Sequence, residues 1–152
     1  MMKTTLAILF SLFVSASAMA VPIVDPWTIS GPGTTSATDS GGGVWDLSYN
    51  LNNGSLLETW TVTSGPVTAA GDYEFEWAYS GLHSVFELEA FLFTSTGTQL
   101  VNTSLPFADP SGFYFSGSYT FVGVSQGDTI GFELGGSHMP SGALQGNLHL
   151  EQ

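Results

Sequence analysis

The chain has 152 residues, of which 43% are hydrophobic and only 9% charged, with 13 acidic side chains and one basic side chain, Lys3. The absence of any later Lys or Arg argues against binding to nucleic acid or to anionic membrane surfaces, because both need those cations. There is no cysteine either, so disulfides and thiol nucleophiles are excluded and the fold must rest on its core.

The N-terminus has the three-part layout of a secretory signal peptide. Lys3 precedes an apolar run from Leu6 to Val14, and the small residues of Ala18-Met19-Ala20 follow. The apolar run is shorter than the roughly 20 residues that cross a bilayer. We therefore expect residues 1–20 to be removed near Ala20 and residues 21–152 to form one domain, secreted to the exterior or, alternatively, to the periplasm.

The rest of the chain has the residue pattern of an all-β protein. Short runs of β-branched and aromatic residues alternate with Gly, Ser and Thr, and no segment has a helical period. This pattern predicts an antiparallel β-sandwich, jelly-roll-like, with eight to ten strands. The expected strands are Val24–Ile29, Val44–Leu51, Ser55–Thr63, Asp72–Tyr79, Val85–Thr94, Gln99–Asn102, Ser118–Val124, Thr129–Leu134 and Ala143–Leu150, with a short addition at Phe113–Phe115. Thr34–Gly43 and Asn102–Gly112 are expected to be loops.

The first predicted hairpin turns at Asn53-Gly54, a pair that tolerates the positive φ of a type I′ turn. Its register would place Trp45 opposite Val62 on an apolar face. The other face would be mostly polar, as in a sandwich with one solvated side.

The second predicted hairpin joins Asp72–Tyr79 to Val85–Thr94 through Gly81-Leu82. If these two strands pair, strand alternation puts four carboxylates on one face: Glu74, Glu76, Glu87 and Glu89. Hard cations such as Ca²⁺ prefer oxygen ligands, so this face is a candidate calcium site. The alternative is a solvated acidic face, and no other cofactor is indicated.

Three strand motifs resemble a known module. They are Gly71-Asp72-Tyr73-Glu74-Phe75-Glu76-Trp77, then Ser116-Gly117-Ser118-Tyr119-Thr120-Phe121, then Gly127-Asp128-Thr129-Ile130-Gly131-Phe132. This series is similar to a β-sandwich module of secreted bacterial proteins, many of which carry a PEP-CTERM sorting tail. The resemblance implies an extracellular or cell-surface role without established catalytic residues. The sorting tail itself is absent from this sequence, which favours plain secretion over anchoring.

The catalytic options are few. Glu76 and Glu87 could serve as the carboxylate pair of a small glycoside hydrolase-like enzyme, although they look exposed and such an enzyme needs a cleft. No G-x-S-x-G motif supports a serine nucleophile, and the three histidines lack metal-ligand spacing: His83, His138 and His149. Asp72 and Asp128 each follow a glycine at a strand start and are expected to be turn residues. We therefore predict a protein that is not an enzyme.

Carbohydrate binding is the remaining option. Jelly rolls commonly bind glycans on exposed aromatic side chains, and Phe113, Tyr114 and Phe115 form a candidate platform, because three consecutive aromatics cannot all point to one side of a strand. The four tryptophans are expected in the core instead: Trp27, Trp45, Trp60 and Trp77. The sequence thus predicts a secreted, non-catalytic protein with a structural or matrix-binding role, or alternatively a carbohydrate-binding module, with polysaccharide or a second copy of the chain as partner.

Overall fold

The computed structural model describes residues 22–54, 57–82, 85–94, 97–103, 112–137 and 142–152, with backbone pairing alone for 53–54, 85–94 and 97–103. The predicted signal peptide, His83, His138 and most of the expected loop Asn102–Gly112 lie outside the described residues. No helix among the described residues could cross a membrane.

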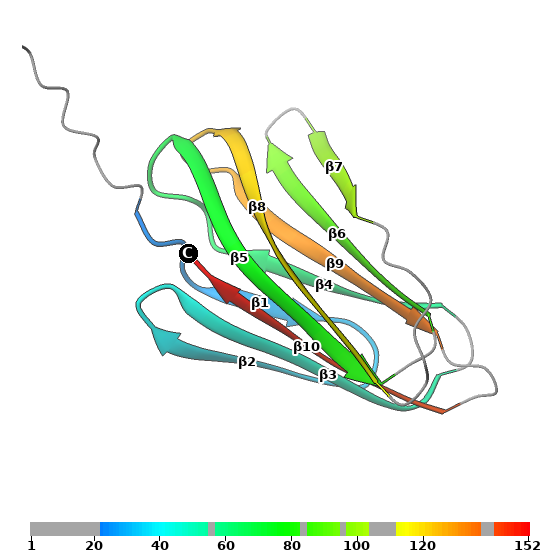
Figure 1. The fold of residues 1–152 in the computed structure, drawn as a ribbon. Coiled ribbons are helices and arrows are strands. Elements are labelled where there is room, and N and C mark those ends of the chain that lie inside the picture. Colours follow the sequence, from blue (N-terminus) through cyan, green and yellow to red (C-terminus); the bar gives the residue numbers. More distant parts are fainter. Residues whose placement is uncertain (1–21, 55–56, 83–84, 95–96, 104–111, 138–141) are drawn as a thin grey trace, which may run out of the picture.

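The fold is an antiparallel β-sandwich of two five-stranded sheets (Figure 1). One sheet has the order β1-β4-β9-β6-β7, and the other has the order β2-β3-β10-β5-β8. The strands are β1 (Trp27–Ser30), β2 (Thr34–Gly41), β3 (Val44–Gly54), β4 (Glu58–Ser64), β5 (Gly71–Leu82), β6 (Val85–Thr94), β7 (Gly97–Thr103), β8 (Phe113–Val124), β9 (Thr129–Ser137) and β10 (Gly142–Glu151). The predicted all-β class and sandwich architecture are confirmed.

Strands β3 to β10 follow jelly-roll connectivity. Within this set, the chain passes to the opposite sheet at every connection except β6 to β7, which pair directly. Most neighbouring strands in each sheet are therefore far apart in sequence, as for Asp46 and His149 on β3 and β10.

Both predicted hairpins are wrong for this reason. β3 pairs with β2 and β10 rather than β4, and β5 pairs with β8 and β10 rather than β6. Gly81 does not turn the chain but lies within β5, opposite Gly146 and Phe113. A side chain at Gly81 would overlap the carbonyl oxygen of Gln145, so the glycine permits close packing of strands.

Strand alternation nevertheless predicts the correct buried faces. Tyr73, Phe75 and Trp77 of β5 are buried, whereas Glu74 and Glu76 between them are exposed. All four tryptophans are buried, with exposed fractions of 9% or less, as predicted. The predicted faces are right even though the predicted pairing partners are not.

The core joins the two sheets through aromatic rings. Tyr49 of β3 stacks on Trp60 of β4 with ring centroids 3.7 Å apart. Phe75, Phe121 and Phe132 form a second cluster of edge-on contacts, with centroids 5.6–6.5 Å apart. Aromatic rings bury a large area each, and they are numerous among the buried side chains of the described core.

Thr34–Gly43 is not the expected loop, because most of it forms β2, the edge strand beside β3. Its side chains are almost all exposed, and none is a large apolar group. A strand with water on both faces carries no apolar alternation, and this is why its sequence resembles a loop.

The two ends of the described chain meet beside the last strand (Figure 1). The backbone N–H of Val24 donates to Oε1 of Gln152 at 2.7 Å, and Nε2 of Gln152 donates to the carbonyl of Pro22 at 3.0 Å. Trp27 is fixed in turn by a hydrogen bond from its Nε1 to the carbonyl of Val24. These contacts hold the N-terminal segment against the end of β10.

Candidate functional site

The outward side chains of the β2-β3-β10-β5-β8 sheet form one surface, which we call the polar face. Its central row crosses all five strands, and each member is the register partner of the next: Ser36, Ser48, Asn147, Ser80 and Tyr114. The first two hydroxyls of this row lie 2.7 Å apart. The row offers hydroxyl and amide groups along its length and one aromatic ring at its end.

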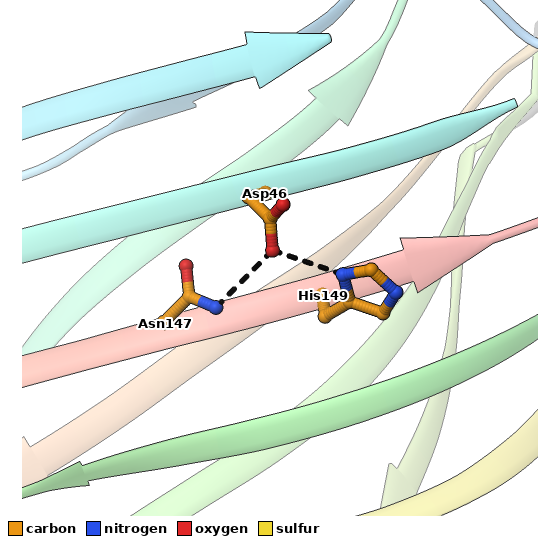
Figure 2. A network of polar contacts seen from close by, with 3 residues as sticks. All are labelled: Asp46, Asn147 and His149. Atoms are coloured by element: carbon orange, nitrogen blue, oxygen red, sulfur yellow. Dashed lines mark hydrogen bonds and ion pairs between the residues drawn. The ribbon is translucent and has the colours of Figure 1, made fainter. Parts of the chain in front are cut away.

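The next row contains a histidine–carboxylate pair. Nδ1 of His149 on β10 lies 2.9 Å from Oδ1 of Asp46 on β3, and Nδ2 of Asn147 reaches the same oxygen at 3.4 Å (Figure 2). Because a carboxylate oxygen accepts hydrogen bonds, Nδ1–H of His149 is the donor in this contact. Both paired side chains keep about two fifths of their surface exposed (39% and 42%), so they are accessible to a ligand.

The polar face contains two neighbouring grooves. The first groove, about 390 Å³, crosses β2, β3, β10 and β5 and is lined mostly by small polar residues: Thr34, Thr35, Ser36, Ser48, Tyr49, Asn50, Ser80, Gly81, Leu82, Gln145, Gly146 and Asn147. The second groove, about 510 Å³, crosses β10, β5 and β8 and is lined by Glu76, Trp77, Ala78, Tyr114, Ser116, Gly117, Ser118, His149 and Glu151. Both are open surfaces of the kind that can hold an extended ligand.

Tyr114 is the one large exposed side chain of the predicted glycan platform. It has 68% of its surface exposed and lines the second groove. Phe113 is 8% exposed and packs edge-on against the ring of Tyr79 at 4.9 Å, and Phe115 is half-buried. Strand alternation therefore splits the three aromatics as expected, and only the middle one is presented outward.

The predicted four-glutamate face does not form. Glu74 and Glu76 point outward from β5, whereas Glu87 and Glu89 belong to β6 of the other sheet. The prediction was wrong because successive strands of a jelly roll join opposite sheets. The carboxylate pair considered for glycoside hydrolysis, Glu76 and Glu87, is separated for the same reason. Within the described part of the chain, no three His, Asp or Glu side chains are grouped so as to hold a metal ion.

Of the two aspartates that follow glycines, Asp128 lies at a turn, as predicted, whereas Asp72 is the second residue of strand β5. Oδ1 of Asp72 accepts a hydrogen bond from the backbone N–H of Gly123 at 2.7 Å. Oδ2 of Asp128 accepts one from the backbone N–H of Ser125 at 2.9 Å. Asp72 is exposed on β5, as Glu74 and Glu76 are, whereas Asp128 is buried beside its turn.

The sequence did not predict Asp46, Asn147 and His149 as site residues. The signal was present in part, because the run Gly142–Glu151 alternates buried leucines with Gln145, Asn147 and His149. That alternation identifies one polar face of a strand. It does not say that β3 lies beside this strand and supplies the carboxylate.

No protein-family model and no curated protein sequence match the chain. Among solved structures, it is similar to TmCBM61 in complex with beta-1,4-galactotriose, with 12% identity, a TM-score of 0.50, and coverage of 85% of this chain and 90% of that one. It also matches a carbohydrate-binding module from Cellvibrio mixtus lichenase 5A in complex with cellotriose, with 12% identity, a TM-score of 0.35, and coverage of 81% and 89%. At these identities the likeness to TmCBM61 shows the β-sandwich fold. The resemblance to a PEP-CTERM-type module stays a prediction.

Proposed function

We propose that this protein is a secreted, non-catalytic carbohydrate-binding module whose binding site is the polar face. The observation that carries the proposal is the position of Tyr114, an exposed aromatic ring at the end of a row of hydroxyl and amide side chains. A sugar ring has C–H groups that pack on an aromatic ring and hydroxyl groups that both donate and accept hydrogen bonds. The polar face offers partners for both.

Asp46 fixes the orientation of polar side chains on this surface. Asp46 receives hydrogen bonds from two β10 side chains and thereby fixes their direction (Figure 2). Binding sites typically combine contact area with a few polar groups held in place, and the groups that are already ordered lose little entropy on binding. Asp46 would act as a positioning residue, and His149 and Asn147 as hydrogen-bonding residues.

The comparison supports the same proposal at the level of fold. TmCBM61 is described in complex with a galactotriose, and it shares this sandwich over most of both chains. Because one fold serves many functions, the argument rests on the polar face and not on the likeness. A structural or matrix role is the other expectation from the sequence, and the surface of the described residues favours carbohydrate binding over it through Tyr114 and its polar row.

Affinity gel electrophoresis tests the proposal. The protein without residues 1–20 is run through native gels that contain β-1,4-galactan, hydroxyethyl cellulose or xylan, and its mobility is compared with that in a gel without polysaccharide. We expect retardation by at least one of the three. Unchanged mobility in all three would contradict the proposed function.

A further inference from the structure

The two grooves of the polar face are continuous across their border. On β5 the outward positions Ser80 and Ala78 belong to the first and the second groove, and on β10 the positions Asn147 and His149 do the same. Three of these four side chains are small or of medium size, and only His149 carries a ring. No bulky wall therefore separates the grooves, and together they form one path.

This path runs across the strands from one edge of the sheet to the other. It begins at β2 and ends at β8, the two edge strands of the sheet. Four strand spacings make it about 19 Å long. Among the described residues, no further strand of the sheet stands beyond β2 or β8, so neither end of the path is closed by a paired strand.

The two parts of the path have different chemistry. The second groove contains the aromatic ring of Tyr114, whereas the first groove contains the amides of Asn50 and Gln145 beside the hydroxyl of Ser48. Asn50 on β3 and Tyr114 on β8 are separated by three strand spacings, about 14 Å. One or two sugar rings that stack on Tyr114 would not reach Asn50.

Building on the proposed function, we infer that the ligand is the interior of a glycan chain several sugars long, which lies across the strands from Tyr114 to the Asn50 end of the first groove. A path open at both edges lets the chain continue beyond the protein on either side. Recognition then depends on chain length and not on a reducing or non-reducing end. The ligand class is a linear polysaccharide and not a mono- or disaccharide.

Calorimetric titration tests this inference with oligosaccharides of the polysaccharide that retards the protein: galacto-, cello- or xylo-oligosaccharides from disaccharide to hexasaccharide. We expect the affinity to rise by about tenfold or more from disaccharide to hexasaccharide, because more sugar rings gain contacts. Reduction of the terminal sugar with borohydride should leave the affinity for the hexasaccharide unchanged.

Two variants locate the ends of the path. Tyr114→Ala should weaken binding of short and long oligosaccharides alike. Asn50→Ala should weaken binding of the hexasaccharide but not of the disaccharide. Thr59→Ala removes an exposed side chain from β4 of the opposite sheet and serves as the control. Thermal melting of each variant confirms that it is folded.

The outcomes separate the inference from the proposed function. Three results would overturn the inference but leave the proposed function standing. They are equal affinity for disaccharide and hexasaccharide, loss of affinity when the chain end is reduced, and no binding of the hexasaccharide although the polymer retards the protein. If none of the polysaccharides retards the protein, the proposed function fails and the inference fails with it.

Discussion

Glu76 and Glu151 are direct register partners on β5 and β10, and both side chains are exposed on the polar face. Like charges opposite one another on neighbouring strands destabilise a sheet. No Lys or Arg follows position 3, so neither residue can form a salt bridge to such a side chain within residues 22–152. Water and dissolved ions must therefore provide most of the screening of the repulsion between the two carboxylates.

The substitution Glu151→Gln should therefore stabilise the protein. We expect a gain of roughly a few tenths of a kcal/mol at low salt, because exposed charges interact weakly, and a smaller gain at high salt. Urea unfolding at two salt concentrations measures it. Glu58→Gln is the control, since it removes one charge from a position whose register partner is Gly136. A gain that does not depend on salt would contradict an electrostatic origin.

The sequence predicted the faces of the strands but not their partners. Side-chain alternation fixes which residues of β5 are buried, because a shift by one residue would exchange the aromatic and carboxylate faces. Side-chain alternation within one strand does not indicate which other strand pairs with it. The glycines at positions 54 and 81 suggested hairpins, yet Gly54 pairs with Gly142 and Gly81 pairs with Gly146 inside the sheet.

The same limit applies to the candidate site. Tyr114 was predictable, because three aromatics in a row must place one on the opposite side of the strand. Asp46 and His149 are 103 positions apart, and only the jelly-roll order brings β3 and β10 together. The polar side chains of β2 also join the site, although their sequence resembles a loop.

Asp46→Ala should weaken polysaccharide binding, by about tenfold or less, because His149 and Asn147 lose the acceptor that fixes their direction. Asp46→Asn keeps an oxygen acceptor at this position and should retain most of the affinity. Calorimetry with the retarding polysaccharide measures both variants. If Asp46→Ala and Asp46→Asn bind equally poorly, the carboxylate has a role other than positioning, such as direct contact with the glycan.

The buried pair Tyr49 and Tyr79 should make the protein sensitive to alkali. Their hydroxyl oxygens lie 2.6 Å apart, and burial raises the pKa of both above the ordinary 10.0. Above that pH the unfolded chain loses protons that the folded chain keeps, so stability falls as the pH rises, by about 1.4 kcal/mol per pH unit for each hydroxyl.

Urea unfolding at several alkaline pH values measures this slope. The double variant Tyr49→Phe/Tyr79→Phe should have a smaller slope than the wild type. Tyr114→Phe, which removes an exposed hydroxyl, should leave the slope unchanged. Equal slopes for the wild type and the double variant would show that the buried pair is not the cause.

The polar face should not bind acidic polysaccharides. Its carboxylates include Asp46, Glu74, Glu76 and Glu151, and among its described side chains only His149 is of a basic type. A chain of uronic acids would meet like charge along the second groove, and no Lys or Arg follows position 3 to balance it. In gels with EDTA, we expect no retardation by polygalacturonate or alginate. Retardation by either would mean that charge does not select the ligand.

The most direct test of the account is the affinity of Tyr114→Ala for the polysaccharide that retards the wild-type protein, measured by calorimetry beside Tyr114→Phe and Leu57→Ala. Leu57 is a large exposed side chain, 54% accessible, that precedes β4 of the opposite sheet. We predict that Tyr114→Ala lowers the affinity by about tenfold or more while the melting temperature stays close to that of the wild type. Tyr114→Phe keeps the ring and should bind almost as well, and Leu57→Ala should bind as the wild type does. Undiminished binding by a folded Tyr114→Ala would contradict the assignment of the glycan site to the polar face.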